Sequence, residues 1–281
     1  MQDILIIGGG TAGLTAAIYA RRAGLSCTVF EGGTPGGKIV ASPEVANYPA
    51  MPKVSGFDYA MALLKQVQEL GAEIVYESVT GADICGKIKR LRTANGEYEG
   101  KTVIIANGAS RKKLGCRGKA VAVVGGGDTA FEDAAYLAGI CSKVYLIHRG
   151  DSFTASDVLQ KPVLENKNIT VLTNSEVSEV SGESSVNTVT VRSRANGSEA
   201  KIAVSAVFVA VGVAPDNAIF GEAVKLDNRG YIIAGEDCLT GTEGVFVAGD
   251  TREKQLRQLV TAAADGAVAA TAAFRYIKKN F

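Results

Sequence analysis

Three features are missing from this sequence of 281 residues, and each absence excludes a class of protein. No apolar run approaches the roughly 18 residues that a membrane-spanning helix needs, so we expect no membrane association. Neither sign of charge dominates, because 30 basic and 29 acidic residues leave a net charge of +1, which argues against a general nucleic-acid binder. No basic segment precedes the apolar run at residues 4–7, so we expect no signal peptide.

Cysteine is too scarce and too scattered for a secreted protein held together by disulfides. The five cysteines are odd in number, and no two of them lie close together in the sequence. A secreted disulfide framework normally has an even number of cysteines at regular spacing. Together with the missing signal peptide, this pattern favours a cytoplasmic protein.

Glycine, in contrast, is abundant: 33 of the 281 residues, or about 12 %, against an average near 7 %. Many of these glycines lie in two similar units, at residues 4–31 and 120–147. In each unit an apolar run is followed by a glycine-rich turn, a segment of helical spacing and a second apolar run. Alternating strands and helices of this kind predict parallel sheets.

Two such units, in a chain whose length suggests about two domains, predict the fold class. We expect an α/β protein with two doubly wound, Rossmann-like, three-layer domains. A further segment, Gly244–Asp250, is a strand that ends in a glycine-aspartate turn and precedes an alanine-rich helix at residues 262–276. We place the joins between the domains near residues 112–118 and 212–217, where basic, glycine and proline residues cluster.

The first glycine turn has the spacing of a dinucleotide-binding site. Gly8 permits a tight turn, Gly10 lets the backbone approach a pyrophosphate, and Gly13 allows close packing of the helix on the strand. The amino end of the helix favours the negative charge of the pyrophosphate. Glu31 lies 18 residues beyond Gly13, at the end of the next strand, where it can accept hydrogen bonds from a ribose.

The motifs at residues 8–19, 34–38, 45–49, 249–250 and 256–259 resemble the FAD domain of the low-molecular-weight thioredoxin reductases. The resemblance covers essentially the whole chain and preserves the order of the family's segments. It implies an FAD-binding domain in two parts, residues 1–112 and 217–281, with an NADPH-binding-like domain inserted at residues 113–216. It also implies a homodimer.

The same resemblance implies which residues contact FAD. The glycine turn and Glu31 hold the pyrophosphate and the adenosine ribose, Val79 lies by the adenine, and Asp250 binds the ribityl chain. Lys38 replaces the family's usual glutamine beside the flavin. The implied FAD-binding residues are Gly8, Gly10, Thr11, Ala12, Gly13, Glu31, Gly32, Gly36, Gly37, Lys38, Asn47, Val79, Gly108, Gly249, Asp250, Arg257, Gln258 and Leu259.

The second glycine turn, at residues 125–130, fits a pyridine-nucleotide fold but lacks the charges of a nucleotide site. Relatives that use NADPH read His-Arg-Arg-x-x-x-Arg, whereas this chain reads His148-Arg149-Gly150-Asp151-Ser152-Phe153-Thr154. Two lost phosphate contacts, each worth about 1.5–3 kcal/mol, would weaken NADPH binding by about two orders of magnitude or more. We therefore predict that the domain is retained without its nucleotide. The alternative is that Arg149 suffices, or that NADH binds.

The family's Cys-x-x-Cys-Asp motif, which precedes the strand of the second glycine turn, is absent. We expect Cys27 and Cys141 to be inert buried thiols and favour a structural role for Cys238. Cys116 lies in a join that we expect to be exposed, and its basic neighbours would lower the pKa of its thiol. The same argument applies more weakly to Cys85. We predict Cys116 and Cys85 as the catalytic pair.

The leading hypothesis is a ferredoxin-dependent flavin thioredoxin reductase, which resembles enzymes of anaerobic bacteria that do not use pyridine nucleotides. Ferredoxin, an acidic electron donor, would be steered to the basic clusters, and thioredoxin would be the acceptor. One alternative is an NAD(P)H-dependent ferredoxin or flavodoxin reductase of the thioredoxin-reductase type. Another is a non-catalytic FAD-binding redox sensor. The sequence predicts no metal site.

Overall fold

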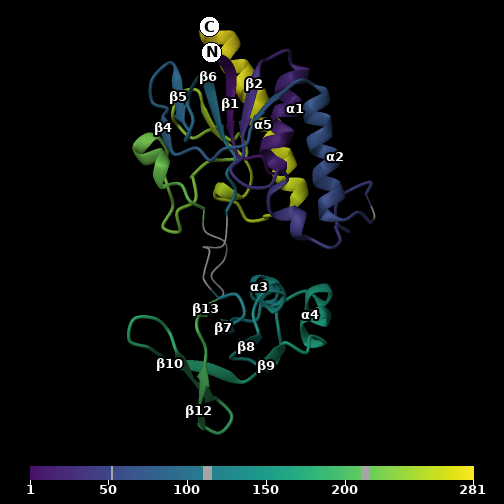
Figure 1. Cartoon of the computed structure of the whole chain (residues 1–281), viewed down its shortest axis with the longest axis vertical. Helices are drawn as coiled ribbons and strands as arrows, with labels where there is room; N and C mark the ends of the chain where they lie inside the picture. Colours follow the sequence, from purple (N-terminus) through teal and green to yellow (C-terminus); the bar gives the residue numbers. More distant parts are fainter. Residues whose placement is uncertain (52, 110–115, 210–214) are drawn as a thin grey trace. The chain divides into compact units, whose positions relative to one another are not determined.

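The chain forms two compact units in the computed structural model, which describes residues 1–51, 53–109, 116–209 and 215–281 (Figure 1). The first unit combines Met1–Ser110 with Ala214–Phe281, and the second is Arg111–Val213. The predicted joins at 112–118 and 212–217 lie largely outside the described residues. The first unit is therefore assembled from two segments that are far apart in the sequence.

The first unit is built on a seven-stranded sheet whose centre is β6. One edge of β6 pairs in parallel with β1, while its other edge pairs first with β5 in antiparallel and then with β14 in parallel. The strands are β1 (Gln2–Ile7), β2 (Cys27–Phe30), β3 (Glu73–Val75), β4 (Gly81–Asp83), β5 (Lys89–Arg92), β6 (Glu97–Ile105) and β14 (Val245–Val247). Through β6, the carboxyl-terminal segment joins the sheet that the amino-terminal segment begins.

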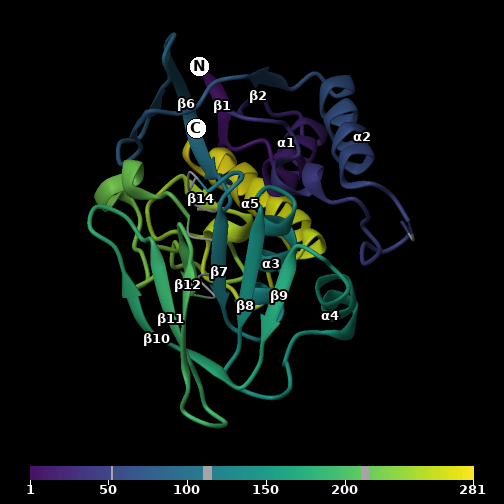
Figure 2. The same ribbon diagram turned by 60° about the horizontal axis from the view of Figure 1, so that its bottom comes forward.

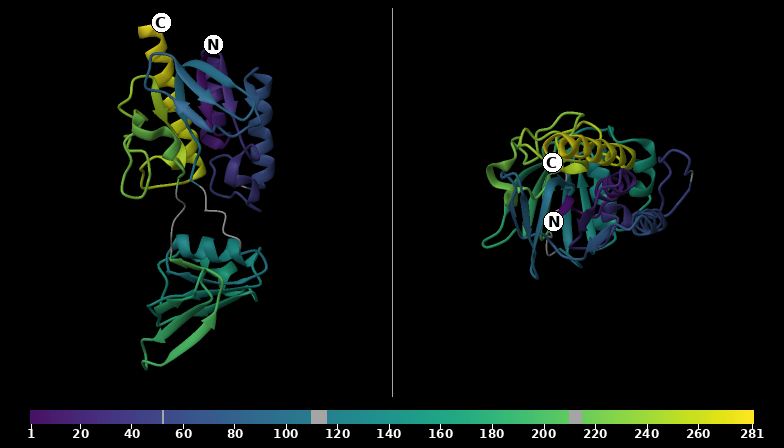
Figure 3. Two further views of the ribbon diagram at one scale, coloured as in Figure 1. Left: turned by 60° about the vertical axis from the view of Figure 1, so that its left-hand side comes forward. Right: turned by 90° about the horizontal axis from the view of Figure 1, so that it is seen from above.

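Alternation along β1 divides the core of this unit into two layers. Ile4 and Ile6 face the helices α1 (Thr11–Arg22) and α5 (Leu259–Asn280), whereas Leu5 and Ile7 face the other side of the sheet. The helix α2 (Gly56–Glu69) packs beside α1 (Figure 1). Both termini lie at one end of this unit (Figure 3).

The second unit is also layered. Its four-stranded sheet pairs β13 (Val207–Val209), β7 (Ala120–Val124), β8 (Lys143–Ile147) and β9 (Ile169–Leu172), all in parallel (Figure 2). One face packs on α3 (Asp128–Ala138) and α4 (Asp157–Leu164). The other face packs on an antiparallel sheet of β10 (Ser175–Ser181), β11 (Thr188–Ser193) and β12 (Glu199–Ala203).

The two layered units confirm the predicted α/β fold class, with a Rossmann-like parallel sheet in each unit. In the first unit the glycine-rich turn connects β1 to α1, and in the second it connects β7 to α3, as the sequence predicts. Within the described residues, no helix is both long enough and apolar enough to cross a membrane.

A buried lysine anchors the hairpin of β4 and β5 in the first unit. Lys89 is only 1 % exposed, and its Nζ donates hydrogen bonds to the carbonyl oxygens of Ile84 at 2.9 Å and Glu243 at 2.5 Å. Burial lowers the pKa of Lys89 below its ordinary value. The ammonium group thereby links the hairpin to the segment that leads into β14.

We predict that Lys89→Ala destabilises the protein by about 2–4 kcal/mol, because it removes two charged hydrogen bonds and leaves a cavity. Equilibrium unfolding in urea measures this loss. The matched control is Lys87→Ala, which removes an exposed lysine from the same hairpin and should cost about 1 kcal/mol or less. Equal losses in the two variants would contradict the anchoring role.

Candidate functional site

The first glycine turn has the geometry that a dinucleotide requires. Gly8 has a positive φ of 103°, and a Cβ atom there would lie 2.3 Å from the carbonyl oxygen of Ala106. A Cβ atom on Gly13 would lie 1.9 Å from the carbonyl oxygen of Gly8. At Gly10, in contrast, an added Cβ atom would meet nothing within 4 Å. The turn therefore packs tightly against the protein at Gly8 and Gly13, whereas the space next to Gly10 is open.

The amino end of α1 lies at this open face, and its first backbone N–H groups have no hydrogen-bond acceptor within the helix. Gly10 precedes the helix without a side-chain cap, and the first turn contains no acidic residue. Thr11 and Ala12, the first two helical residues, are buried. Free backbone N–H groups and the helix dipole together favour an anion at this position. A pyrophosphate fits there.

Glu31 lies beside the turn, as the sequence predicts. Its Oε2 accepts a hydrogen bond from the backbone N–H of Gly9 at 2.7 Å, and its Oε1 accepts one from Gly33 at 2.7 Å. Each oxygen keeps a lone pair that a ribose hydroxyl could use. A Cβ atom on Gly32 would lie 1.8 Å from Oγ of Ser78, so glycine is needed where this loop meets the segment before Val79.

A second loop closes on the glycine turn through Gly36 and Gly37, before the 3-10 helix η1 (Gly37–Ala41). The backbone N–H of Gly36 donates to the carbonyl oxygen of Gly9 at 2.7 Å. Both glycines have positive φ angles, and a Cβ atom on Gly37 would lie 3.3 Å from Cα of Gly10. The loop thus reaches the open side of the first glycine turn, and we call this turn together with the loops around it the cradle.

The carboxyl-terminal segment reaches the same cradle. Gly249, which opens the 3-10 helix η3 (Gly249–Thr251), packs so closely that a Cβ atom there would lie 2.8 Å from Cβ of Ala12. Asp250 Oδ2 lies 3.9 Å from Lys38 Nζ, and both side chains retain exposed surface. The lysine in the place of the family's glutamine is therefore paired with the predicted ribityl-binding aspartate.

Two buried polar atoms near these loops have no hydrogen-bond partner among the described residues: Arg257 Nε and Asn107 Oδ1. The guanidinium of Arg257 lies over the ring of Tyr231, 4.1 Å from its centroid. Asn107 precedes Gly108, where φ is +64° and an added Cβ atom would meet nothing within 4 Å. Unpaired buried groups are costly, so a ligand that supplies their partners fits this face.

The predicted residues Asn47 and Gln258 are in contact, although they are far apart in the sequence. Asn47 Nδ2 donates to Oε1 of Gln258 at 3.0 Å. Gln258 caps α5, which begins at Leu259. All the predicted FAD-binding residues lie in the first unit, and the contacts above bring both of its chain segments to the glycine turn.

A buried ion cluster behind the Gly249–Asp250 turn was not predicted. Arg252, whose side chain is 2 % exposed, donates from Nε and Nη2 to the two carboxylate oxygens of Asp265, each at 2.9 Å. Lys254 Nζ lies 2.8 Å from Asp265 Oδ2, which also accepts from the backbone N–H of Gly249 at 2.9 Å. Asp265 therefore fixes the turn that carries Asp250.

The second glycine turn is covered by the loop that follows β8. The ring of His148 packs on Gly126, where an added Cβ atom would lie 2.3 Å from it. The backbone N–H groups of Thr154 and Ala155 donate to the carbonyl oxygen of Gly126 at 2.8 and 3.1 Å. The Thr154 hydroxyl donates to the same oxygen at 3.3 Å, so this position supplies no cation.

One cation near this loop was missed by sequence reasoning. Arg194, from the turn after β11, donates from Nη1 to the carbonyl oxygen of Arg149 at 3.4 Å. Its Nε lies 3.8 Å from Oε2 of Glu176, which offsets part of its charge. No sequence signal could have found it, because Arg194 is 45 residues from Arg149 along the chain.

Four of the five cysteines are buried. Burial raises the pKa of Cys27, Cys141 and Cys238 to about 12. This fits the buried thiols that we expected at Cys27 and Cys141 and the structural role that we favoured for Cys238. The expectation of an exposed Cys116 is wrong: it is 4 % exposed and packs in the core of the second unit. Only three residues separate it from the start of β7, so it belongs to the core that forms around that strand.

Cys85 is exposed, but its surroundings are less basic than the sequence suggests. Strand alternation turns Lys89 inward, and Arg90 pairs with Glu99, with 2.9 Å between Nε and Oε1. Arg111, Lys112 and Lys113, the predicted basic neighbours of Cys116, lie outside the described residues. Because Cys85 belongs to the first unit and Cys116 to the second, their pairing stays a prediction.

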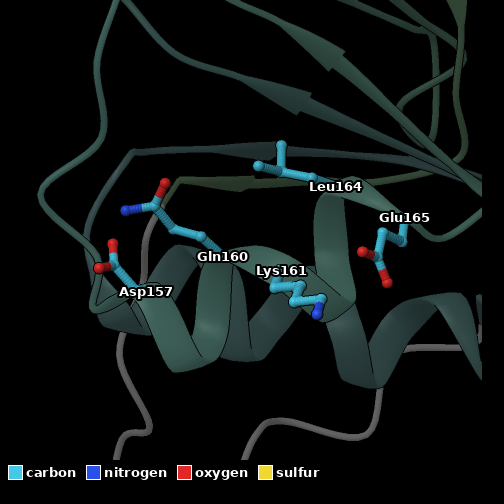
Figure 4. A pocket seen from close by; sticks show the side chains of 5 residues that line it. All are labelled: Asp157, Gln160, Lys161, Leu164 and Glu165. Atoms are coloured by element: carbon cyan, nitrogen blue, oxygen red, sulfur yellow. The ribbon is translucent and has the colours of Figure 1, made fainter.

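A hollow of about 300 Å³ lies on α4 (Figure 4). All of its lining residues come from this one helix and its carboxyl end: Asp157, Gln160, Lys161, Leu164 and Glu165. It is shallow and contains neither a cysteine nor a glycine turn. We therefore place no substrate in it.

Comparisons with known proteins identify relatives over the whole chain. Residues 2–121 and 117–266 match the sequence family described as pyridine nucleotide-disulphide oxidoreductase. A thioredoxin reductase of Peptoclostridium acidaminophilum is 37 % identical over 310 aligned positions, covering 100 % of this chain and 98 % of that protein. Since the alignment is longer than the 281 residues of this chain, the relative carries segments that this chain lacks.

Solved structures show the same fold. The thioredoxin reductase of Lactococcus lactis superimposes with a TM-score of 0.82 at 30 % identity, covering 99 % of this chain and 100 % of that one. A ferredoxin-flavin thioredoxin reductase of Clostridium acetobutylicum superimposes with a TM-score of 0.59 at 26 % identity, covering 99 % and 98 %.

The buried ion cluster predicts a loss of stability in acid. Burial alone would raise the pKa of Asp265, but hydrogen bonds from Arg252 and Lys254 outweigh it and hold the pKa below its ordinary value. A carboxyl with a lower pKa in the folded state stabilises the protein above about pH 4, and this contribution is lost as the pH falls through the folded-state pKa.

We expect Asp265→Asn to lose about 3–5 kcal/mol at neutral pH, because it leaves the Arg252 charge buried and unpaired. The difference in unfolding free energy between this variant and the unmodified protein should become smaller below about pH 4. Urea unfolding over a pH series measures both effects. Glu253→Gln, which neutralises an exposed carboxyl on the same segment, is the control and should change little.

The open space above Gly10 predicts a variant that folds but does not bind its cofactor. Gly10 has a φ of −75°, which alanine tolerates, so Gly10→Ala should leave the unfolding midpoint of the cofactor-free protein unchanged. Its FAD dissociation constant should rise by at least about tenfold, since the added methyl group occupies the pyrophosphate position. Fluorescence titration of FAD measures this change.

The control for this variant is Gly96→Ala in the same unit, where the added Cβ atom lies 3.8 Å from the Tyr98 ring. It should bind FAD as the unmodified protein does. Unchanged FAD affinity in Gly10→Ala would mean that the cofactor is held elsewhere.

Proposed function

Because the chain belongs to the low-molecular-weight thioredoxin reductases of the pyridine nucleotide-disulphide oxidoreductase family, we propose that it reduces thioredoxin with electrons from ferredoxin. FAD is the cofactor of this family. When bound, FAD supplies the coupling between a donor of single electrons and a disulfide that takes two. The chain's own residues hold it, orient it and provide the sulfur chemistry.

In this proposal the first unit binds FAD. The turn from Gly8 to Gly13 and the amino end of α1 hold the pyrophosphate, and Glu31 accepts from the ribose. Asp250 binds the ribityl chain and keeps its ion pair with Lys38. The buried unpaired Nε of Arg257 is the observation that favours a bound ring system here, because an acceptor on the ring would satisfy it.

The proposed donor rests on one observation in the second unit. Where NADPH-using relatives carry their second and third arginines, this chain has Gly150 and Thr154, and Thr154 is bonded to the glycine turn by both its backbone N–H and its hydroxyl. Arg149 and Arg194 remain, with Glu176 beside Arg194. Too little positive charge is left for a nucleotide 2′-phosphate, so a protein donor is favoured.

The sulfur chemistry also departs from the family pattern. No Cys-x-x-Cys motif occurs in the sequence, and the alignment with the Peptoclostridium relative requires segments that are missing here. Cys116, which precedes the strand of the second glycine turn, is our candidate for the catalytic thiol, and Cys85 is the partner that the sequence suggests. The resemblance to the family also supports a homodimer.

An anaerobic titration of the flavin absorbance with NADPH, NADH and reduced ferredoxin tests the donor. We expect reduced ferredoxin to bleach the flavin at about two equivalents, since it gives single electrons, and the pyridine nucleotides to leave it oxidised. Thioredoxin reduction should then follow ferredoxin and not NADPH.

The double variant Arg149→Gln, Arg194→Gln is the control for this titration. It should respond to all three donors as the unmodified protein does. If NADPH rapidly bleaches the flavin of the unmodified protein but not that of this variant, the proposed donor is wrong and the second unit binds a nucleotide.

A further inference from the structure

We propose that Cys116 and Cys141 are the redox-active pair of this enzyme, cycling between two thiols and a disulfide within the second unit. This inference rests on the proposed function, which requires a dithiol, and it replaces Cys85 by a cysteine that sequence reasoning set aside. The two residues are 25 positions apart in the sequence and meet only in the folded sheet.

The backbone brings the two cysteines together. Gly118 N–H donates to the carbonyl oxygen of Ile140 at 2.9 Å, and Ser142 N–H donates to that of Lys119 at 3.1 Å. These bonds join the segment before β7 to the segment before β8, the two strands whose pairing begins at Ala120 and Lys143. Each cysteine therefore lies on one of two adjacent, hydrogen-bonded segments.

The side chain of Cys141 also reaches Cys116. Cys141 Sγ donates to the carbonyl oxygen of Cys116 at 3.3 Å, and that oxygen is only four bonds from the Sγ atom of Cys116. Both residues pack in the same core, at 4 % and 6 % exposure. A disulfide needs Cα atoms within about 4.4–6.8 Å, a separation that two adjacent hydrogen-bonded segments can reach.

The surroundings give the two thiols different roles. Burial raises the pKa of Cys141 to about 12, and the neighbouring Cys116 thiol adds to the effect, so Cys141 stays protonated until a reaction begins. Cys116 is followed directly by three exposed residues, of which Arg117 and Lys119 are cationic. Cys116 is thus the attacking residue and Cys141 the resolving one.

The remaining cysteines of the described chain offer no such partner. Cys27 Sγ interacts with the carbonyl oxygen of Ala17 at 4.0 Å, and Cys238 Sγ donates to that of Asp265 at 3.6 Å. Both belong to the first unit, as does exposed Cys85. Cys116 and Cys141 are the two cysteines of the second unit, so one unit contains the whole pair.

A protein disulfide takes its two electrons from the reduced cysteine pair in two exchange steps. The Cys116 thiolate attacks one sulfur of the acceptor, breaking its S–S bond and forming a mixed disulfide, and the released thiolate takes up a proton. Cys141 then loses its proton and attacks Sγ of Cys116, releasing the second acceptor thiol. The acceptor gains two electrons and two protons, and the enzyme keeps a Cys116–Cys141 disulfide. The reduced cofactor returns two electrons, with two protons, to restore both thiols.

Disulfide mapping of the unmodified holoenzyme tests the pairing without any variant. The reduced protein is treated with oxidised thioredoxin, its free thiols are alkylated, and the peptides are identified by mass spectrometry. We expect a peptide that links Cys116 to Cys141, with Cys27, Cys85 and Cys238 alkylated. A link between Cys85 and Cys116, or no link at all, would overturn the proposal.

Cysteine variants then separate this pairing from the proposed function. Cys141→Ser should lower thioredoxin reduction by at least about a hundredfold, because no resolving thiol remains, while ferredoxin still bleaches its flavin. The buried-thiol control Cys27→Ser should retain both activities. A thermal melt checks that each variant folds.

The outcomes distinguish the two claims. A Cys141→Ser variant that folds and still reduces thioredoxin contradicts the pairing and leaves the proposed function intact. A Cys116–Cys141 link in an enzyme that takes electrons only from NADPH contradicts the donor and leaves the pairing intact.

Discussion

The close contact between α1 and α5 is the constraint on which the first unit depends. A Cβ atom on Gly266 would lie 2.2 Å from the carbonyl oxygen of Ala12, so glycine is required where the two helices touch. The next residue back along α5 is Asp265, whose carboxylate holds the backbone of Gly249 and the side chain of Arg252. Two successive residues of α5, Asp265 and Gly266, thus determine both the contact between the helices and the position of the Gly249–Asp250 turn. This explains how two chain segments, separated by a whole unit, produce one cradle.

The second unit uses the same turn with a different result. Its glycine turn is covered by the loop of residues 148–155, which bonds to Gly126, whereas the first turn is left open above Gly10. Asp128, in the first turn of α3, already accepts from the backbone N–H of Ser156 at 2.7 Å and places negative charge at the amino end of that helix. The amino end of α1 has no such carboxylate. The two turns share a backbone motif and differ in what surrounds it.

The sequence predicts those parts of the site that depend on local spacing. A single strand–helix–strand unit contains both the glycine turn at residues 8–13 and Glu31. Their relative position therefore follows from the residue spacing of strands and helices. The family resemblance assigned Asn47 and Gln258 each to the flavin but did not predict that they are in contact. The Arg252–Asp265 pair and Arg194 were not predicted, because burial and long-range pairing decide what a charged residue does. Lys89 shows the limit clearly, since in the sequence it reads as one more exposed cation of a basic run.

The two cysteines of the second unit lie too far apart in the sequence to form a recognisable motif. In a Cys-x-x-Cys motif one short turn fixes both sulfur atoms, so the sequence alone reveals the pair. Cys116 and Cys141 are instead fixed by backbone bonds between the segments entering β7 and β8, and therefore by the pairing of those strands. A dithiol of this kind exists only when the sheet is formed. It also lies at the amino ends of the strands, whereas the glycine turn lies at the carboxyl end of β7. In the proposed enzyme, a change in nucleotide contacts at one end of the sheet would therefore not alter the dithiol at the other end.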